Sequence, residues 1–254
     1  MRAINAINRL PLLLTFALFG GCATQAALQQ PDDQNSEAAT VNLQLGIGYI
    51  QAGRFDVAAE KLRKALEYDN NLAEAHNALA ILYEETGEYR LADQEYQQAI
   101  QKDPKYLLAR VNYGRFLCRI GKANEGEGQF LLAIANPELE NPDVAYSGAG
   151  ECARILSVPE RAGRYFRKAL EINPFNAGAL WQLASLDYEQ GDYLQAREFL
   201  QRYHKQTDYN PASLRLGIAI EKALGEQQLQ REYERLLLTK FANSDEARRL
   251  TKSE

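Results

Sequence analysis

A repeat of 34 residues is the feature that most limits what this chain can fold into. The first three windows, which cover residues 39–140, align without gaps. The register resumes after a two-residue insertion near Asn141-Pro142. The windows are 39–72, 73–106, 107–140, 143–176 and 177–210, followed by a degraded copy at 211–244. Self-similarity at one fixed period predicts a stack of like units that share a continuous core.

The residues that recur within each window indicate what one unit is. Small residues recur where two helices must approach closely, at Gly46, Ala80, Gly114, Gly150 and Ala184. Glycines that can adopt a left-handed conformation end the first helix, at Gly53, Gly87, Gly121, Gly191 and Gly225. Pro104 and Pro174 stop second helices. This pattern predicts an all-α, right-handed superhelical solenoid of about six tetratricopeptide (TPR) repeats over 39–254, with a C-terminal capping helix in Phe241 to Glu254.

The first 22 residues differ from the rest and resemble an export signal. Arg2 and Arg9 give a positive start, residues 10–19 are largely apolar, and Gly20-Gly21-Cys22 follows. The apolar run is too short for a membrane span, which predicts a signal peptide over 1–21. The small-small-Cys ending is similar to a bacterial lipobox, in which the thiol of Cys22 receives acyl chains such as palmitate. The alternative is a plain secretory signal with an incidental Cys.

The segment that follows Cys22 is polar and shows no period up to Thr40. We expect a flexible, disordered tether over 22–38, between the lipid and the solenoid. Asp after the lipidated Cys usually retains a bacterial lipoprotein in the inner membrane. Ala23 stands there instead, which favours the periplasmic face of the outer membrane.

Composition argues against several classes of function. The 29 basic and 34 acidic residues give a net charge of −5 without basic runs, so nucleic acid is not an expected partner. The chain has three Cys and two His, and His76 and His204 lie in different units. We therefore predict that the protein binds no metal and no cofactor other than the covalent lipid. Because the sequence also lacks a phosphate-binding loop and a nucleophile motif, we predict that it is not an enzyme.

Cys118 and Cys152 lie late in the first helices of neighbouring units. Because such helices pack side by side, the two thiols could face one another, and an exported domain lies where thiols oxidise. A disulfide here would close a loop of about 35 residues and stabilise the fold by roughly 3–4 kcal/mol. The alternative is a pair of buried free thiols.

The concave face of the solenoid is the expected binding site. Positions 2, 5, 9 and 12 of the first helix point into the concavity of TPR units. The predicted groove residues are Leu43, Ile47, Ile50, Asn77, Ile81, Glu84, Val111, Arg115, Trp181 and Tyr188. Leu43 and Ile47 replace the polar residues that would clamp a C-terminal carboxylate, so an amphipathic helix or an apolar peptide is the better fit. Alternatively, these side chains only pack within their own repeat.

Several stretches resemble the type IV pilus biogenesis lipoproteins called PilF or PilW. They are 112–118, 148–153, 179–184, 193–197, 201–203 and the ending 237–247, where Ala242 stands in place of a frequent Pro. The resemblance implies a pilotin of the outer membrane, which escorts the pilus secretin and promotes its assembly into a ring. The implied partners are the secretin subunit and the outer-membrane lipid. The competing hypothesis is a TPR lipoprotein scaffold of another envelope machine, in outer-membrane assembly or in the regulation of peptidoglycan enzymes.

Overall fold

The computed structural model describes residues 31–252, and every regular element in this range is a helix. The helices are α1 (Pro31–Gln51), α2 (Phe55–Tyr68), α3 (Ala73–Glu85), α4 (Tyr89–Lys102), α5 (Leu107–Arg119), α6 (Ala123–Ile134), α7 (Pro142–Ile155), α8 (Pro159–Ile172), α9 (Ala177–Glu189), α10 (Tyr193–His204), α11 (Pro211–Leu224), α12 (Gln227–Lys240) and α13 (Asp245–Lys252). Each predicted repeat holds one pair of these helices, and α13 follows the last pair.

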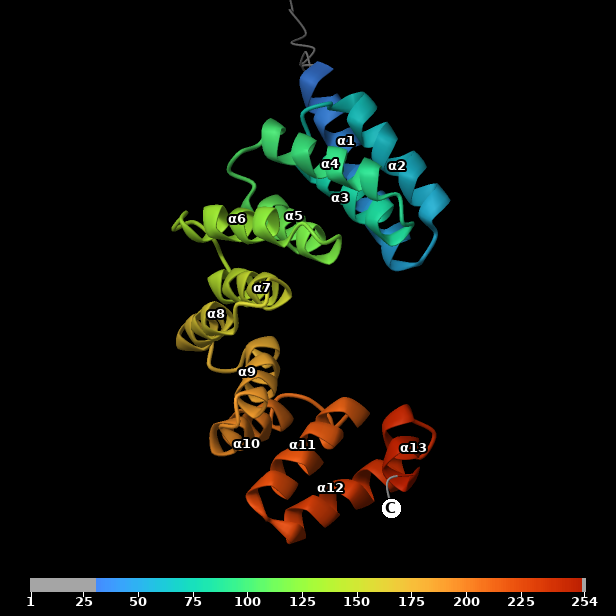
Figure 1. Ribbon diagram of the computed structural model, residues 1–254. Coiled ribbons are helices and arrows are strands. Elements are labelled where there is room, and N and C mark those ends of the chain that lie inside the picture. Colours follow the sequence, from blue (N-terminus) through green and yellow to red (C-terminus); the bar gives the residue numbers. More distant parts are fainter. Residues whose placement is uncertain (1–30, 253–254) are drawn as a thin grey trace, which may run out of the picture.

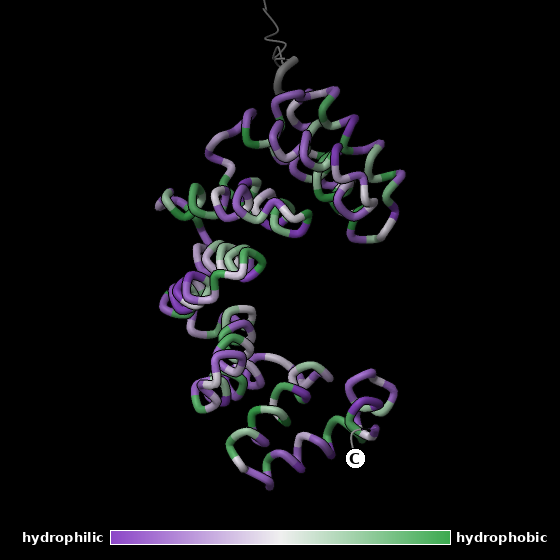
Figure 2. Tube along the Cα trace, in the orientation of Figure 1, coloured by the Kyte–Doolittle hydropathy of each residue, from purple (hydrophilic) through white to green (hydrophobic). Residues whose placement is uncertain are grey.

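The helix pairs stack into an open curve (Figure 1). The first helices α5 and α7 lie on the inner side of this curve, and their partners α6 and α8 lie on the outer side. Hydrophobic and hydrophilic positions alternate along each helix in Figure 2, as expected of helices that bury one face and leave the other in water. The predicted TPR solenoid is therefore the fold of the chain.

The turn inside each unit depends on one residue in the left-handed conformation. Five of the six turns use the predicted glycines, with φ between 68° at Gly53 and 85° at Gly121. In the fourth unit Ser157 takes this place, with φ of 58°. A side chain in this conformation costs about 1–2 kcal/mol relative to glycine. The fourth unit therefore folds despite a strained turn.

Large side chains from the second helices fill the space between the helices of a pair. Leu62, Tyr96, Phe130 and Phe166 are fully buried, as the spacing predicts. The ring of Phe130 lies so close to Gly148 on α7 that a Cβ atom there would stand 2.2 Å from it. The third and fourth units therefore pack through a contact that only a glycine allows.

Helix α1 starts earlier than the sequence pattern indicates. The prediction of a disordered tether was wrong from residue 31 onward, because α1 is helical from Pro31. Ala39 is buried, and the Asn42 side chain donates to the carbonyl of Ala38. A helix whose later turns are held by packing propagates at little cost into a polar stretch. The earlier part of the tether and the signal peptide lie outside the described residues.

The capping helix predicted in the last fourteen residues is α13, from Asp245 to Lys252. The hydroxyl oxygen of Ser244 accepts a hydrogen bond from the backbone of Ala247, which satisfies one of the first amide groups of the helix. Ala247 is buried in a cluster with Ile218 of α11 and Leu237 of α12. This contact covers the apolar end of the last repeat.

Candidate partner-binding groove

Three hollows follow one another along the first helices of the third, fourth and fifth units. The first, of about 380 Å³, lies between the start of α5 and the turn before α7. The second, of about 340 Å³, lies between α5 and α7, and the third, of about 470 Å³, lies between α7 and α9. Val111 and Val144 line both the first and the second, and Glu151 lines both the second and the third. Together they form one groove, here called the central groove.

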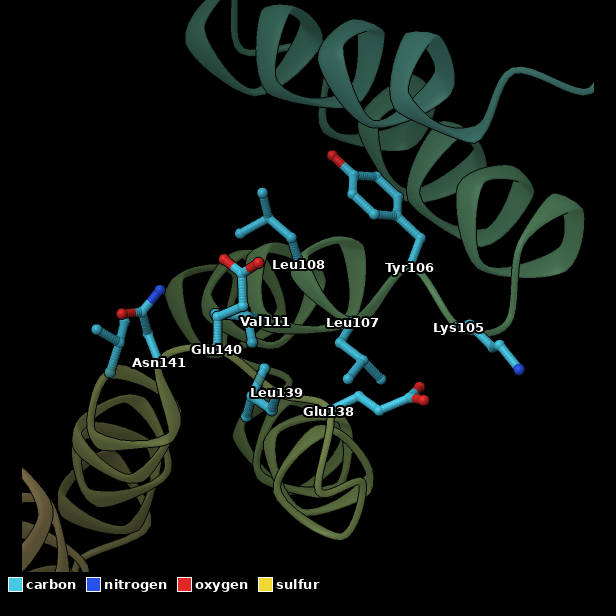
Figure 3. A pocket seen from close by; sticks show the side chains of 10 residues that line it. Lys105, Tyr106, Leu107, Leu108, Val111, Glu138, Leu139, Glu140 and Asn141 are labelled. Carbon is cyan, nitrogen blue, oxygen red and sulfur yellow. The ribbon is translucent and has the colours of Figure 1, made fainter.

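The first hollow arises from the two-residue insertion. The turn from α6 to α7 covers residues 135–141, whereas the turns at 69–72, 103–106 and 173–176 are shorter. Leu139, Glu140 and Asn141 of the longer turn face Leu107, Leu108 and Val111 at the start of α5, as Figure 3 shows. The insertion therefore holds the two units apart at this end and leaves a mostly apolar pocket, which we call the insertion pocket.

The far ends of α5 and α7 are joined by a disulfide between Cys118 and Cys152 in this structure. Their Cα atoms lie 5.4 Å apart, within the range that such a bond requires. Cys152 is fully buried and Cys118 nearly so. The two helices that frame the insertion pocket are thus tied at the opposite end of their length. The oxidised state in the purified protein stays a prediction.

Two of the predicted groove residues belong to the core instead. Leu43 packs in the first hydrophobic cluster beside Leu62, and its exposed fraction is 9%. Asn77 is also buried, because it accepts a hydrogen bond from Asn112 and its amide lies 3.5 Å from the hydroxyl of Tyr106. The prediction that these two side chains face a partner was wrong. Leu43 contributes to the apolar core of the first cluster, and Asn77 joins the second unit to the third.

The other candidates from the first two units differ in how far their side chains are exposed. Ile47 is exposed, whereas Ile50 and Ile81 are half-buried and pack against the first cluster. Glu84 is largely buried, accepts a hydrogen bond from Tyr96 and forms an ion pair with Arg119 at 2.7 Å. Of these four residues, only Ile47 is an exposed apolar residue, with an exposed fraction of 38%.

The candidates from the later units lie closer to the central groove. Val111 and Arg115 both line its second hollow, although Val111 is almost covered. Trp181 lines the third hollow, with its ring 5.6 Å from that of Tyr203. Tyr188 is half-buried against the core and lies against Tyr193 instead. The structure thus brings Val111, Arg115 and Trp181 to one groove.

The fourth unit supplies groove residues that the sequence analysis did not name. Positions 2, 5, 9 and 12 of window 143–176 are Val144, Ser147, Glu151 and Arg154, and each lines a hollow. Position 2 of the third unit is Leu108, which is 52% exposed in the insertion pocket. The positional rule applied to the third unit would have found Leu108, and applied to the fourth unit would have found the other four.

Charges in the central groove are partly compensated by neighbours. Arg115 donates to Asn112 at 2.7 Å, and Arg154 donates to Gln182 and Glu189, both at 2.9 Å. Burial raises the pKa of the Glu151 carboxyl, and the nearby Arg115 opposes that rise. Arg115 and Arg154 are therefore held by polar contacts, while the side chains of Leu108 and Val144 remain open.

The repeats match family models described as TPR repeat, over residues 48–87, and tetratricopeptide repeat, over 73–106 and 159–216. The type IV pilus assembly protein PilF of Pseudomonas aeruginosa is 31% identical over 216 residues, which cover 84% of this chain and 85% of that protein. The chain belongs to the PilF family of type IV pilus biogenesis TPR proteins.

Two solved structures agree with this membership of the PilF family. The structure of Pseudomonas aeruginosa PilF superimposes with a TM-score of 0.78 at 29% identity, covering 87% of this chain and all of that one. The structure of PilW, described as a widely conserved type IV pilus biogenesis factor, gives a TM-score of 0.78 at 26% identity over 84% of this chain and 98% of that one. The likeness therefore extends through the whole solenoid.

The two histidines of this PilF-family chain contact neighbouring side chains outside the central groove. The ring of His76 bonds Glu95 at 2.6 Å, and His204 lies among Tyr203, Tyr209 and Tyr233. Residues 31–252 hold no group of three His, Cys, Asp or Glu side chains placed to bind a metal ion. No helix in that range is long and apolar enough to cross a membrane. Cys22 precedes the range, so its lipidation stays a prediction.

Proposed function

We propose that this protein is a pilotin of the type IV pilus system. It is anchored through acyl chains on Cys22 at the periplasmic face of the outer membrane, and it binds the secretin subunit on the concave side of the solenoid. The observation that carries the proposal is the central groove on a fold of the PilF family, because a groove with open apolar side chains fits an amphipathic segment. No part of this role requires catalysis or a cofactor.

Deletion of the gene tests the role. The expected result is that secretin multimers, detected as heat-resistant species in outer-membrane fractions, are lost or appear in the wrong membrane. The full-length gene should restore them. Correctly located multimers in the deletion strain would overturn the proposal. A pull-down that recovers cell-wall enzymes or outer-membrane assembly factors in place of secretin would favour the scaffold hypothesis.

The anchor is tested separately by a Cys22→Ser variant. We expect this variant to lose incorporation of labelled palmitate and to move from the membrane fraction to the soluble fraction. The Ala23→Ser variant is the matched control, because it changes the neighbouring residue and keeps the thiol of Cys22. Labelled palmitate on Cys22→Ser protein would exclude the predicted anchor.

The concave face is tested by charge introduced at an exposed apolar residue. Ile47→Asp should weaken secretin binding without changing the helical spectrum, because this side chain is exposed. Leu132→Asp on α6 is the control, since Leu132 is also exposed but belongs to a second helix. Ile81→Asp should also weaken binding, and its spectrum must be checked because Ile81 packs partly against the core. Unchanged binding by both groove variants would move the contact away from the first two units.

A further inference from the structure

The insertion pocket is more enclosed than the rest of the groove and differs from it in charge. Its volume of about 380 Å³ exceeds the roughly 150 Å³ that accepts a benzene-sized ring. Leu107 and Val111 form a nearly covered apolar floor. Leu108 and Val144, each about half exposed, form open walls. A site of this kind suits one large apolar side chain rather than a flat helix face.

The rim of the insertion pocket carries an excess of negative charge. Glu138 and Glu140 come from the long turn, and the single ammonium group of the lining is Lys105. In Figure 3 the Glu140 carboxylate lies beside Leu108 and Val111, whereas the Lys105 side chain points outward. Burial raises the pKa of the Tyr106 phenol, and the negative charge of the nearby Glu74 adds to this rise. An occupant with a basic residue beside its apolar anchor complements this rim.

We propose that the insertion pocket binds a large apolar side chain of the secretin, next to a Lys or Arg that pairs with Glu140. This inference rests on the proposed function and adds to it a specific subsite and a chemistry for the bound segment. The pocket exists because the insertion lengthens one turn, and its walls are held by α5 and α7. The subsite lies between the third and fourth units, away from Ile47 in the first unit.

Photo-crosslinking in intact cells tests the position of the contact. The full-length protein carries p-benzoylphenylalanine at Leu108 or Val144, and at the exposed Leu132 of α6 as the matched control. The expected result is a secretin adduct from both pocket positions and none from the control. The same probe is also placed at the exposed Ile47, and an adduct from that position alone would overturn the subsite and leave the pilotin role standing. Failure at all positions, with secretin multimers intact in a deletion strain, would overturn the role itself.

The identity of the crosslinked material tests the chemistry. Mass spectrometry of the adduct should map to a secretin segment in which a large apolar residue adjoins a Lys or Arg. A segment without such a pair would contradict the proposed charge match. An adduct between two copies of this chain, or with a protein other than the secretin, would overturn the proposed occupant.

Binding of purified, full-length protein to the secretin then tests each part of the pocket. Leu108→Ala and Glu140→Lys should each weaken the affinity about tenfold, by loss of apolar contact and by repulsion of the basic residue. Leu132→Ala and Glu67→Lys make the same chemical changes at exposed sites on the second helices α6 and α2. The controls should bind within about twofold of the parent. Equal affinities for pocket and control variants would overturn the proposal.

Discussion

The junctions between units fall into two kinds, according to the length of the turn that connects them. Short turns at 103–106 and 173–176 accompany hydrogen bonds between polar side chains, such as Asn112 to Asn77 and Asn176 to Asp143. They also accompany partly exposed ion pairs, Arg119 with Glu84 and Arg154 with Glu189. Longer turns at 135–141 and 205–210 accompany stronger links. These are the Cys118–Cys152 disulfide and the buried ion pair of Arg197 with Glu221.

This difference indicates how a solenoid tolerates insertions. A short turn limits where the next unit can lie, so hydrogen bonds and partly exposed ion pairs are enough to fix its position. A longer turn leaves the next unit more conformational freedom. Because this freedom is lost on folding, a stronger bond must offset the entropy cost. In this chain the insertion also creates a pocket, so the same junction combines a looser connection with a site for a partner.

Removal of the disulfide should have the largest effect on this comparison. The Cys118→Ala/Cys152→Ala variant is expected to lose about 3–4 kcal/mol of unfolding free energy, because the closed loop no longer restricts the unfolded chain. Chemical denaturation measures the loss. Reductant should destabilise the parent in the same way and leave the variant unchanged. Equal thiol labelling of denatured parent with and without prior reduction would show that the bond is absent.

Breaking the buried ion pair should cost nearly as much. Arg197→Met leaves the Glu221 carboxylate, which is almost fully buried, without its partner, so we expect a loss of about 3 kcal/mol. The double variant Arg197→Met/Glu221→Leu removes both charges and should recover most of the loss. Denaturation curves of the two proteins measure the difference. If both variants are equally unstable, the junction depends on the packing of these two side chains rather than on their charges.

A short-turn junction should be less sensitive. Asn112→Ala removes hydrogen bonds to Asn77 and Arg115, with an expected cost of about 1–2 kcal/mol. A double-mutant cycle with Asn77→Ala isolates the contact between the two amides. If Asn112→Ala lost more unfolding free energy than the disulfide variant, the comparison would be reversed. The junction with the short turn would then depend more on its side-chain link than the junction with the long turn.

Near neutral pH, the pH dependence of stability should show the smallest effect, and it should involve the second long turn. Burial lowers the pKa of His204, next to this turn, to about 4. Between about pH 6.5 and pH 4 the unfolded chain therefore binds a proton that the folded protein does not, so stability falls as the pH falls. Above this window the group contributes no pH dependence.

The measurement is the unfolding free energy of the parent and of His204→Phe across pH 4 to 7. The Phe variant keeps a ring among Tyr203, Tyr209 and Tyr233 but removes the titrating group. Its curve should be flatter in this window than that of the parent. Parallel curves would mean that His204 binds its proton equally well in both states.

The sequence predicted the helix pairs because their requirements are local and recur. Gly53 and Gly121 end first helices and Phe130 fills a core, and each does so at a fixed position in its unit. The start of α1 was missed because a polar stretch carries no apolar period, and packing further along the chain decides whether it is helical.

The site was predicted less completely, for reasons that differ between residues. Val144 and Glu151 obey the same positional rule as Val111, so the sequence held enough to find them. The burial of Asn77 depends on which polar residue of the next unit lies opposite, and a single unit does not contain that information. The depth of the insertion pocket depends on the path of the turn at 135–141, which no repeat pattern describes.

The disulfide also sets how the molecule responds to mechanical tension. Helix α6 and the whole turn at 135–141 lie between Cys118 and Cys152, a separation of 34 residues. Fully extended, such a segment would span roughly 110–120 Å. A pull on the two ends of the chain cannot draw out this length while the bond is intact. Neighbouring units would extend first, and the turn that forms one side of the insertion pocket would be shielded from the load.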